Sequence, residues 1–415
     1  MDLPASSAPV AHDVAIVGGG LVGASLAIAL DRIGLNVALV EATALGDPPP
    51  VFDERNLSLA DTSINALTTL GVLSGLRAPP GLIRRIHVSR AGDFGRVALH
   101  AADYGRDAFG LVVTARDLGL ALEARLGACT RLVRYRPARF VGFETVPACR
   151  RALRLADATG ERMIDAALVV GADGTRSAVR AALGIGVQEH DYQQTLFVTR
   201  VRASRPPDGT AWERFGPTGP NALLPRGDRH YGAVLGVGAD QADAVAALDE
   251  QAFLQRLQHT FGWRAGRFLA CGARSAYPAV RVLAEHTIAP GAVLVGNAAQ
   301  TVHPIGAQGF NLGLRDAMTL AQMLTHAGLA AVENDGGTSL LARYVEQRRE
   351  DRATTLAFCD GLARLTANPA PIAAGLRALG LLAADRVPVL QARIVSGAMG
   401  YRGQVPALCR VQDSI

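Results

Sequence analysis

The chain has 415 residues, of which 49% are hydrophobic, and this length suits two domains with substantial cores. Its 42 basic residues, all of them arginine, exceed its 37 acidic residues by only five and are spread along the chain. Such a distribution argues against a nucleic-acid partner, because nucleic-acid-binding proteins carry clustered basic stripes. The five cysteines have neither paired nor metal-like spacing, which predicts a reducing compartment, no disulfide framework and no metal site.

The two ends of the chain bear on its location. Residues 1–13 lack the basic and apolar segments of a secretory signal. The apolar stretch 371–384 contains Arg377 and is too short to span a bilayer. We therefore expect a cytoplasmic protein, either soluble or in peripheral contact with the inner membrane.

The beginning of the chain has the pattern of a βαβ unit. A short β-branched run at 14–17 is followed by three glycines and by 21–33, where apolar residues recur at helical spacing. A second strand is expected at 37–40, and such a unit implies a parallel sheet with a right-handed crossover. A helix is expected next, over 65–73.

The pattern changes in the middle of the chain. Residues 112–126 predict a strand that leads into a helix, and 166–170 predict a buried strand. Between 193 and 237, short strands alternate with proline and glycine turns, which indicates an antiparallel sheet. The other expected elements are a helix over 242–261, a buried strand at 293–295, a long helix over 312–326 and helices from 344 onward.

The first motif that carries chemistry is Gly18-x-Gly20-x-x-Gly23, between the first strand and the first helix. Gly18 permits the tight turn, Gly20 lets the backbone approach a pyrophosphate, and Gly23 allows close contact between helix and strand. Glu41 ends the second strand, where an acid accepts hydrogen bonds from ribose hydroxyls. This pattern predicts a dinucleotide site but does not distinguish FAD from NAD.

The second motif is 171–177 (GADGTRS), which follows the predicted strand at 166–170. Ligands of open α/β sheets gather at the carboxyl ends of such strands, so Asp173 is a candidate for the same site. An aspartate before a glycine is equally typical of an ordinary turn.

The third motif comprises 296–300 (GNAAQ) and 303–311 (HPIGAQGFN), between a buried strand and a long helix. The amide of Asn297 can hydrogen-bond a ribityl hydroxyl, and backbone amides at the helix start can stabilise the negative charge of a reduced flavin. The alternative is a connection that uses glycine for geometry alone. That alternative does not account for so many polar residues between two apolar runs.

Together the three motifs resemble the fingerprints of single-component flavoprotein aromatic hydroxylases, the para-hydroxybenzoate hydroxylase-like FAD monooxygenases. Within that family the chain is most similar to the ubiquinone-biosynthesis branch, and there to the 2-octaprenyl-6-methoxyphenol hydroxylases. The resemblance extends from about residue 13 into the C-terminal region. The stretches that carry it are 212–225 (WERFGPTGPNALLP), 261–266 (FGWRAG), 275–278 (SAYP), 296–316 (GNAAQTVHPIGAQGFNLGLRD) and 344–352 (YVEQRREDR).

The resemblance implies an α/β fold with three parts. These are a discontinuous Rossmann-like FAD-binding domain (10–76, 108–187 and 287–360), an inserted antiparallel β-sheet domain for substrate (77–107 and 188–286) and a helical C-terminal segment (361–415).

The resemblance also implies which residues contact FAD. Gly18, Gly20, Gly23 and Glu41 would hold the ADP half, and Arg55 would lie near the pyrophosphate or the flavin. Arg116 and Asp173 would support the cofactor, and Gly296 and Asn297 would contact its ribityl chain. The isoalloxazine ring would be framed by Gly306, Ala307, Gln308, Gly309, Phe310 and Asn311.

The chain departs from the family pattern at two of these positions. Asn297 stands where the wider family usually has aspartate, although the ubiquinone branch also has asparagine there. Gly306-Ala307 reverses the usual Ala-Gly order, and alanine does not take the positive φ that glycine accepts freely. His303 could assist proton movement beside the flavin, or it could be a structural histidine bonded to backbone. We assign no catalytic base, so the catalytic residues are unknown at this point.

The implied reaction is hydroxylation of the ring of a polyprenylated phenol in ubiquinone biosynthesis, with NAD(P)H as donor, O₂ as co-substrate and a C4a-hydroperoxyflavin as oxidant. Other ubiquinone-biosynthesis proteins are possible partners. Alternatives are a monooxygenase of soluble phenols, a polyprenyl reductase, or a non-catalytic flavin-binding subunit of a biosynthetic complex. We expect the substrate to be reached at the membrane surface through the apolar end at 371–390. The alternative for that stretch is a helix packed on the FAD domain.

Overall fold

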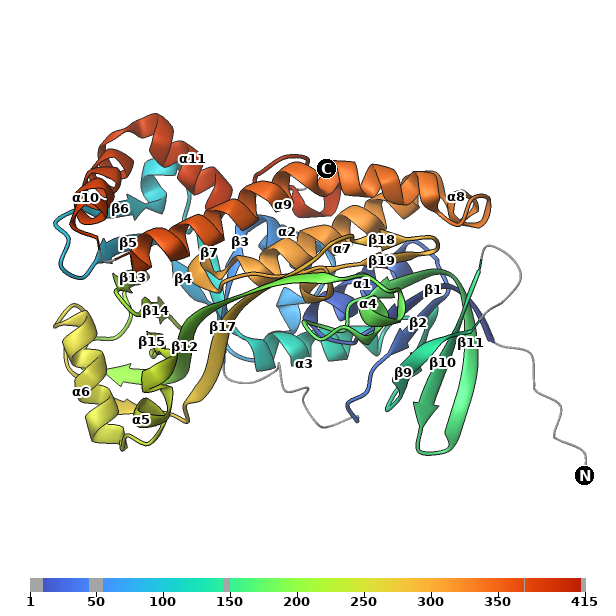
Figure 1. Cartoon of the computed structure of the whole chain (residues 1–415), viewed down its shortest axis with the longest axis horizontal. Coiled ribbons are helices and arrows are strands. Elements are labelled where there is room, and N and C mark those ends of the chain that lie inside the picture. The colour runs from blue at the N-terminus through green and yellow to red at the C-terminus, as the bar shows by residue number, and fades with distance from the viewer. Residues whose placement is uncertain (1–9, 45–54, 145–149, 369, 412–415) are drawn as a thin grey trace, which may run out of the picture.

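The computed structural model describes residues 10–44, 55–144, 150–368 and 370–411, and Figure 1 shows the whole chain. Two large sheets occupy opposite halves of the molecule, and helices pack on both (Figure 1). A small third sheet contains β3 (Asn56–Ala60), β4 (Gly81–Ile83) and β7 (Gly110–Thr114).

The first sheet has a parallel core whose strands come from three separated segments of the chain. Its order is β19-β11-β1-β2-β8, and each neighbouring pair is parallel. The carboxyl ends of these strands therefore lie at one edge, as the βαβ pattern predicts. The strands are β1 (Val10–Val17), β2 (Val37–Val40), β8 (Leu132–Tyr135), β11 (Gly160–Gly171) and β19 (Ala292–Leu294).

Antiparallel strands that the sequence patterns did not predict extend this sheet. β9 (Arg139–Glu144) pairs with β10 (Arg151–Asp157), which pairs with the first half of β11. Because its first residues form this second ladder, β11 begins at Gly160 and not at 166. The short β18 (Ile288–Ala289) adds an antiparallel edge beside β19.

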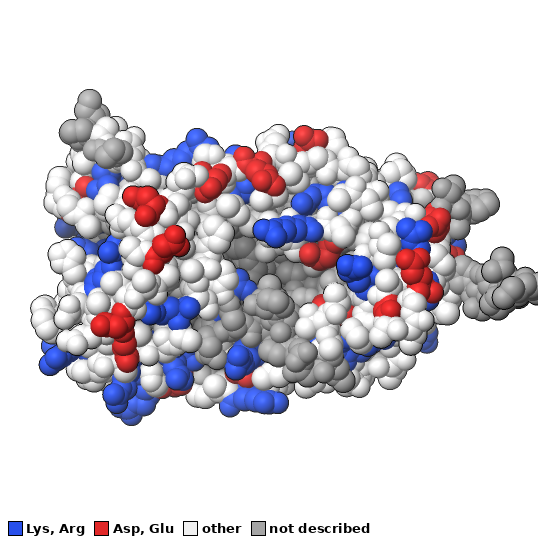
Figure 2. Space-filling model, turned by 60° about the horizontal axis from the view of Figure 1, so that its bottom comes forward, with Lys and Arg blue, Asp and Glu red and all other residues white. Residues whose placement is uncertain are grey.

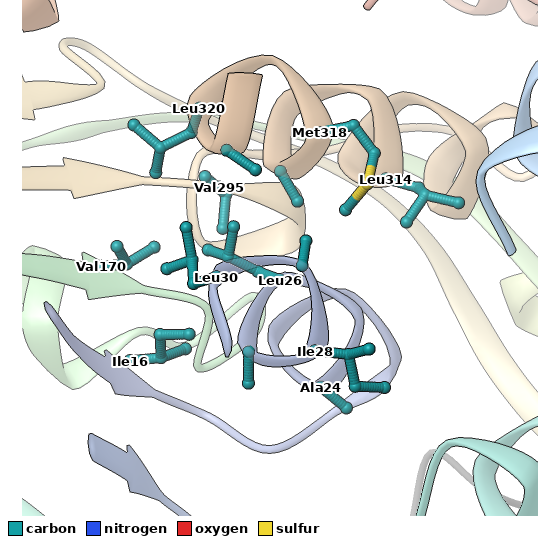
Figure 3. Packing of buried hydrophobic residues seen from close by; sticks show 14 of the residues in the cluster. Ile16, Ala24, Leu26, Ile28, Leu30, Val170, Val295, Leu314, Met318 and Leu320 are labelled. Carbon is teal, nitrogen blue, oxygen red and sulfur yellow. The ribbon is translucent and has the colours of Figure 1, made fainter. Parts of the chain in front are cut away.

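Helix α1 (Leu21–Arg32) lies between the parallel sheet and α7 (Gln308–Ala327). Every residue from 23 to 30 is buried, because the helix is apolar on nearly all sides and both neighbours cover it. Figure 3 shows Leu26 and Leu30 of α1 directed toward Val295 and the side chains of α7. The other helices around this sheet are α2 (Asp61–Thr69), α3 (Ala115–Leu126), α4 (Ala178–Ala182), α8 (Ala330–Glu333) and α9 (Thr338–Ala367).

The second sheet has the order β20-β17-β12-β15-β14-β13-β5-β6, and β16 pairs with β12. Its pairs are antiparallel except β13 with β5, which is parallel. It carries α5 (Ala242–Ala246) and α6 (Glu250–Phe261). The strands are β5 (Arg85–Arg90), β6 (Arg96–His100), β12 (Val187–Ala203), β13 (Thr210–Gly216), β14 (Gly219–Pro225), β15 (Tyr231–Gly238), β16 (Phe268–Cys271), β17 (Ser275–Ala284) and β20 (Gln300–Thr301).

The fold class predicted from the sequence is confirmed, but several element boundaries were wrong. The single helix expected over 242–261 is two helices, because Asp249 caps a new helix by accepting a hydrogen bond from the amide of Ala252 (2.7 Å). The helix expected over 65–73 is α2, which begins at Asp61 and is followed by Gly71 at a φ of +71°. Helix α7 begins at Gln308, four residues before the predicted start at 312.

The C-terminal segment contains α10 (Pro371–Arg386) and α11 (Pro388–Ala398) at the end of the molecule that carries the second sheet (Figure 1). Helix α10 packs mainly on β6 and α11, and it also contacts α9. Among the described residues, no helix is both long and apolar enough to cross a bilayer.

Candidate cofactor site

The first glycine motif forms the tight turn between β1 and α1. Gly18 has a φ of +107°, and its amide donates to the carbonyl of Val40 (2.8 Å). A Cβ atom at Gly18 would overlap the backbone of Ala172, and one at Gly23 would overlap the carbonyl oxygen of Gly18. These two glycines are therefore required by the close packing of turn, helix and β11.

Gly20 differs from these two because the protein itself does not require glycine there. Its backbone is extended, with φ −66° and ψ −178°, which any residue adopts. A Cβ atom at this position would meet no described atom within 4 Å. Helix α1 begins directly after it, with no side-chain cap and no acidic residue in its first turn. Open space at the positive end of a helix fits a bound phosphate group.

Glu41 lies at the end of β2, against the glycine turn. Its Oε2 accepts a hydrogen bond from the amide of Gly19 (2.8 Å), and its Oε1 accepts one from the amide of Thr43 (2.8 Å). These two bonds fix the carboxylate beside the glycine turn. Each oxygen has a further lone pair for a ribose hydroxyl.

The second motif is held mainly by its own hydrogen bonds. The carboxylate of Asp173 accepts from the hydroxyl of Ser177 and from the amide of Val179 (3.0 Å). Its carboxylate therefore organises the turn before α4. The backbone of Asp173 and Ala172 contacts Gly18, which brings the first and second motifs together.

Arg180, which the sequence analysis did not single out, joins the second motif to the third. Its guanidinium donates to the carbonyl of Thr175 (2.8 Å) and to that of Ala298 (2.9 Å). The hydroxyls of Thr175 and Thr301 also bond each other (2.8 Å). No local pattern in the sequence indicates this role, because the contact with Ala298 joins segments that are far apart in the chain.

The third motif begins where β19 ends. Gly296 has a φ of +58°, and a Cβ atom there would lie 3.3 Å from Val22 of α1. The next residue, Asn297, is exposed, and its side chain has no hydrogen-bond partner among the described residues. Its amide thus points away from the core at the place where all three motifs meet.

The turn before α7 differs from what the order Gly306-Ala307 suggested. Gly306 has a φ of +68°, and Ala307 follows with φ +51° and ψ +38°. The expectation that alanine would avoid positive φ here was therefore wrong. The amide of Ala307 donates to the carbonyl of Pro304 (3.1 Å), which closes the turn and holds both residues in the left-handed region.

The side chain of Asn311 is fully hydrogen-bonded within the protein. Its Oδ1 accepts from the amide of Ala60 (2.8 Å), and its Nδ2 donates to the carbonyls of Ser58 (2.9 Å) and Ala307 (2.8 Å). Asn311 thereby ties β3 to the start of α7.

Gln308 is also buried, but only half of its amide is bonded. Its Nε2 donates to the carbonyl of Gly306 (3.0 Å), whereas its Oε1 has no partner among the described residues. A buried acceptor without a partner costs free energy, and a ligand beside this turn could supply the donor. Gly309 and Phe310 complete the first turn of α7.

Arg55 lies on the segment before β3, and Arg116 lies at the start of α3. The amide of Ala115 donates to the carbonyl of Arg55 (2.8 Å), and Arg116 is exposed in the first turn of α3. The guanidinium of Arg55 lies over the ring of Tyr277, 4.8 Å from its centroid. Arg55 directly precedes β3. Asn311 links β3 to the third motif.

His303 is a structural histidine. Its Nδ1 accepts a hydrogen bond from the amide of Ile305 (3.1 Å), so its Nε2 carries the proton and bonds Oε1 of Gln194 (3.1 Å). Burial lowers the pKa of His303 to about 4. Both ring nitrogens are occupied, which favours the structural alternative over proton transfer.

The three motifs thus meet at the carboxyl edge of the parallel sheet and leave space beside Gly20 and Asn297. Figure 2 shows the molecule hollowed near the centre of one face, with arginine and acidic side chains around the hollow. Open space at Gly20, an exposed amide at Asn297 and an orphaned acceptor at Gln308 fit a bound FAD. Among the described residues, no cluster of His, Cys, Asp or Glu could hold a metal ion.

Comparison with known proteins agrees with this geometry. The family described as FAD binding domain matches residues 11–358. The chain is 34% identical to ubiquinone hydroxylase UbiL of Rhodospirillum rubrum, over 96% of this chain and 93% of that protein. It is 30% identical to 3-demethoxyubiquinol 3-hydroxylase of Escherichia coli, over 94% of this chain and 98% of that protein.

Solved structures show the same fold. The chain superposes on p-nitrophenol 4-monooxygenase PnpA of Pseudomonas putida with a TM-score of 0.77 and 18% identity, covering 97% of this chain and 100% of that one. For PqsL, a probable FAD-dependent monooxygenase of Pseudomonas aeruginosa, the TM-score is 0.73 at 21% identity, covering 90% and 99%. At these identities the likeness establishes the fold and not the substrate.

Proposed function

Because the chain belongs to the FAD binding domain family, we propose that it is the FAD-dependent hydroxylase of a polyprenylated phenol in ubiquinone biosynthesis. The observation that carries this proposal is the similarity to a ubiquinone hydroxylase over 96% of the chain. NAD(P)H is the proposed electron donor and O₂ the co-substrate.

The residues of the site have separate tasks in this proposal. The first amides of α1 bind the pyrophosphate beside Gly20, and Glu41 accepts hydrogen bonds from the ribose. Asn297 bonds the ribityl chain, and the amides of Gly309 and Phe310 at the start of α7 stabilise negative charge on the ring system. FAD, when bound, would supply the redox chemistry between NAD(P)H and O₂.

The domain assignment is part of the proposal. The parallel sheet and its helices would form the FAD-binding domain (10–76, 108–187 and 287–360), and the second sheet the substrate domain (77–107 and 188–286). β20 supports this arrangement, because it belongs to the third motif yet pairs with β17 of the second sheet. The turn between β20 and α7 would therefore lie at the junction of the two domains.

We further propose that the substrate is taken from the membrane surface through the C-terminal apolar patch, which we define as Leu376, Leu379, Val387, Val389 and Leu390. All five side chains are exposed, and Val389 and Leu376 reach 71% and 64%. Exposed apolar patches mark interaction sites. A polyprenyl tail partitions into lipid at about 0.8 kcal/mol per buried CH₂, so the enzyme must meet its substrate at the membrane or receive it from a partner protein.

The charges of this segment are mostly turned away from the patch. Arg377 is buried and pairs with Asp93 (2.9 Å) in the turn between β5 and β6. Asp385 accepts a hydrogen bond from the amide of Ala98 in β6 (2.9 Å). The exposed Arg386 remains at the edge of the patch, where it suits anionic lipid head groups.

Liposome flotation tests the membrane proposal. The full chain should float with vesicles that contain anionic lipid, and a Leu376→Ser, Leu379→Ser, Val389→Ser variant should float less. The matched control is Val133→Ser, which alters another exposed valine on β8. A full-length protein that never floats, and that hydroxylates short soluble phenols as readily as prenylated ones, would contradict this part of the proposal.

A further inference from the structure

Glu213 is an acidic residue in the middle of β13, in the interior of the second sheet. It pairs with Val88 of β5 on one side and with Ala222 of β14 on the other. Among the described residues, its carboxylate has no hydrogen bond and no ion pair. An acid inside a sheet normally finds such a partner, because an unsatisfied carboxyl in apolar surroundings destabilises the fold.

The residues around Glu213 on the same face of the sheet are apolar and covered. Ala211 and Phe215, two positions away on β13, are each 4% exposed, and Ala222 is also buried. Glu213 itself keeps partial exposure. Its accessible part therefore faces space that its apolar neighbours do not fill. In these surroundings burial raises the pKa of Glu213 to about 8.

This face of β13 points toward the third motif. Phe215 belongs to one apolar cluster with Val302 and Ile305, which lead directly into the turn at Gly306. Ala211 belongs to a second cluster, which contains residues of β4, β6 and β7 together with Ala384 of α10 and Val395 of α11. Because a strand advances about 3.3 Å per residue, Glu213 lies about 7 Å from Phe215 along β13, between the two clusters.

We infer that Glu213 hydrogen-bonds the hydroxyl group on the ring of the substrate and selects phenols over rings that lack this hydroxyl. The inference rests on the proposed function, because it takes an aromatic ring as the ligand. Apolar clusters on both sides suit the ring and its tail, and the carboxyl group of Glu213 can fix the ring's orientation beside the turn that precedes α7. A site built to bond a hydroxyl rejects an analogue without one, because its own polar group is then left unsatisfied.

The test compares the binding of 2-geranylphenol and of its methyl ether to the FAD-loaded protein, measured by the change in flavin absorbance. The parent should prefer the phenol by about ten- to a hundredfold, the effect of one buried hydrogen bond. Glu213→Leu should bind both ligands equally, whereas Glu213→Gln, which can still form the bond, should keep part of the preference. Glu189→Gln, an exposed acid on β12 of the same sheet, is the matched control and should behave as the parent.

The outcomes separate this inference from the proposed function. Equal affinities for the two ligands in the parent, or an unchanged preference in Glu213→Leu, would overturn the role of Glu213. If the Leu variant does not fold, Glu213→Ala is measured in its place against the same criterion. Hydroxylated product is scored in a separate assay, so a parent that prefers the phenol without hydroxylating it would refute the proposed function and leave the role of Glu213 standing.

Discussion

Gly20 and Gly23 belong to one motif, but the structure gives them different reasons for being glycine. Gly20→Val should leave the stability of the cofactor-free protein nearly unchanged, because no described atom lies where the side chain would go. It should abolish FAD retention, because a branched side chain would occupy the space next to the helix start. FAD content after gel filtration, with thermal unfolding of the cofactor-free protein, measures both effects.

Gly23→Ala is the contrasting variant. Its methyl group would overlap the carbonyl oxygen of Gly18, so the cofactor-free protein itself should unfold at lower temperature. A Gly20→Val protein that keeps full FAD occupancy would remove the first motif from the cofactor site.

His303 makes stability depend on pH in a defined range. Its pKa is about 4 in the folded protein and 6.5 ordinarily, so between these values the unfolded chain binds a proton that the folded chain does not. The contribution of His303 to the free energy of unfolding is therefore fully present above pH 6.5. It is lost as the pH is lowered toward 4, and the loss is about 3 kcal/mol.

Urea unfolding of the parent and of His303→Gln across this pH range tests the prediction. Glutamine can still bond Ile305 and Gln194 but does not titrate, so the free energy of unfolding of the variant should fall less steeply. His100→Gln, at an exposed histidine, should follow the parent. Parallel curves for the parent and His303→Gln would show that His303 titrates normally.

At the scale of elements, the turn between β20 and α7 stores backbone strain at Ala307. A left-handed conformation costs an L-residue about 1–2 kcal/mol, and glycine avoids this cost but loses more entropy on folding. Ala307→Gly should therefore raise the free energy of unfolding by up to about 1 kcal/mol. Gly306→Ala should lower it, because Gly306 also has a positive φ and its Cβ would lie 3.4 Å from Phe358. Effects of the same sign would contradict this view of the turn.

Helices α7 and α9 are joined by a buried network of charges. Asp351 accepts from Nε of Arg315 (2.7 Å) and from Nη2 of Arg348 (2.7 Å), and Arg348 also bonds Asp316 (2.7 Å). Burial opposes ionisation of Asp351, but Arg315 and Arg348 outweigh it and hold its pKa below the usual range.

Removing one member of this network should be costly. Asp351→Asn leaves two buried guanidinium groups without their shared carboxylate, and we expect a loss of about 3–5 kcal/mol in the free energy of unfolding. Glu350→Gln changes the neighbouring exposed acid and should have almost no effect. Denaturant unfolding measures the free energy of unfolding of both variants. A loss in Asp351→Asn as small as that in Glu350→Gln would show that the network is dispensable.

Elements were predictable where the signal is local. The strand at 37–40 and the strand–helix pair at 112–126 have strong periodicity, and the structure places β2, β7 and α3 there. The early start of β12 was missed because residues 187–195 are largely polar and pair with β17, which is distant in sequence. The break between α5 and α6 was missed because the helical periodicity of apolar residues does not reveal that the side chain of Asp249 caps a new helix.

At the scale of the whole molecule, the sequence indicated the parts of the cofactor site but not how they are held together. Gly18, Ala172 and Gly296 could be placed near one edge because parallel strands end there. The link made by Arg180 could not be foreseen, because it depends on the packing of α4 against the third motif. Glu213 was missed because an acid in a strand gives no local sign that its face is covered by other elements.

The surface of the C-terminal segment could also be predicted only in part from the sequence. Its composition predicted an apolar end, but only the fold shows that Arg377 and Asp385 turn toward β5 and β6 while the apolar patch stays exposed.

The central claim is that the chain uses FAD to place one oxygen atom from O₂ on the ring of a prenylated phenol. The most direct measurement is the mass of the product formed from 2-geranylphenol under ¹⁸O₂, with the FAD-loaded full chain and either NADH or NADPH. We predict a singly hydroxylated ring that carries one ¹⁸O atom, and no product with the Gly20→Val variant. Consumption of NADH or NADPH without a hydroxylated ring, or a product whose oxygen comes from water, would contradict the account.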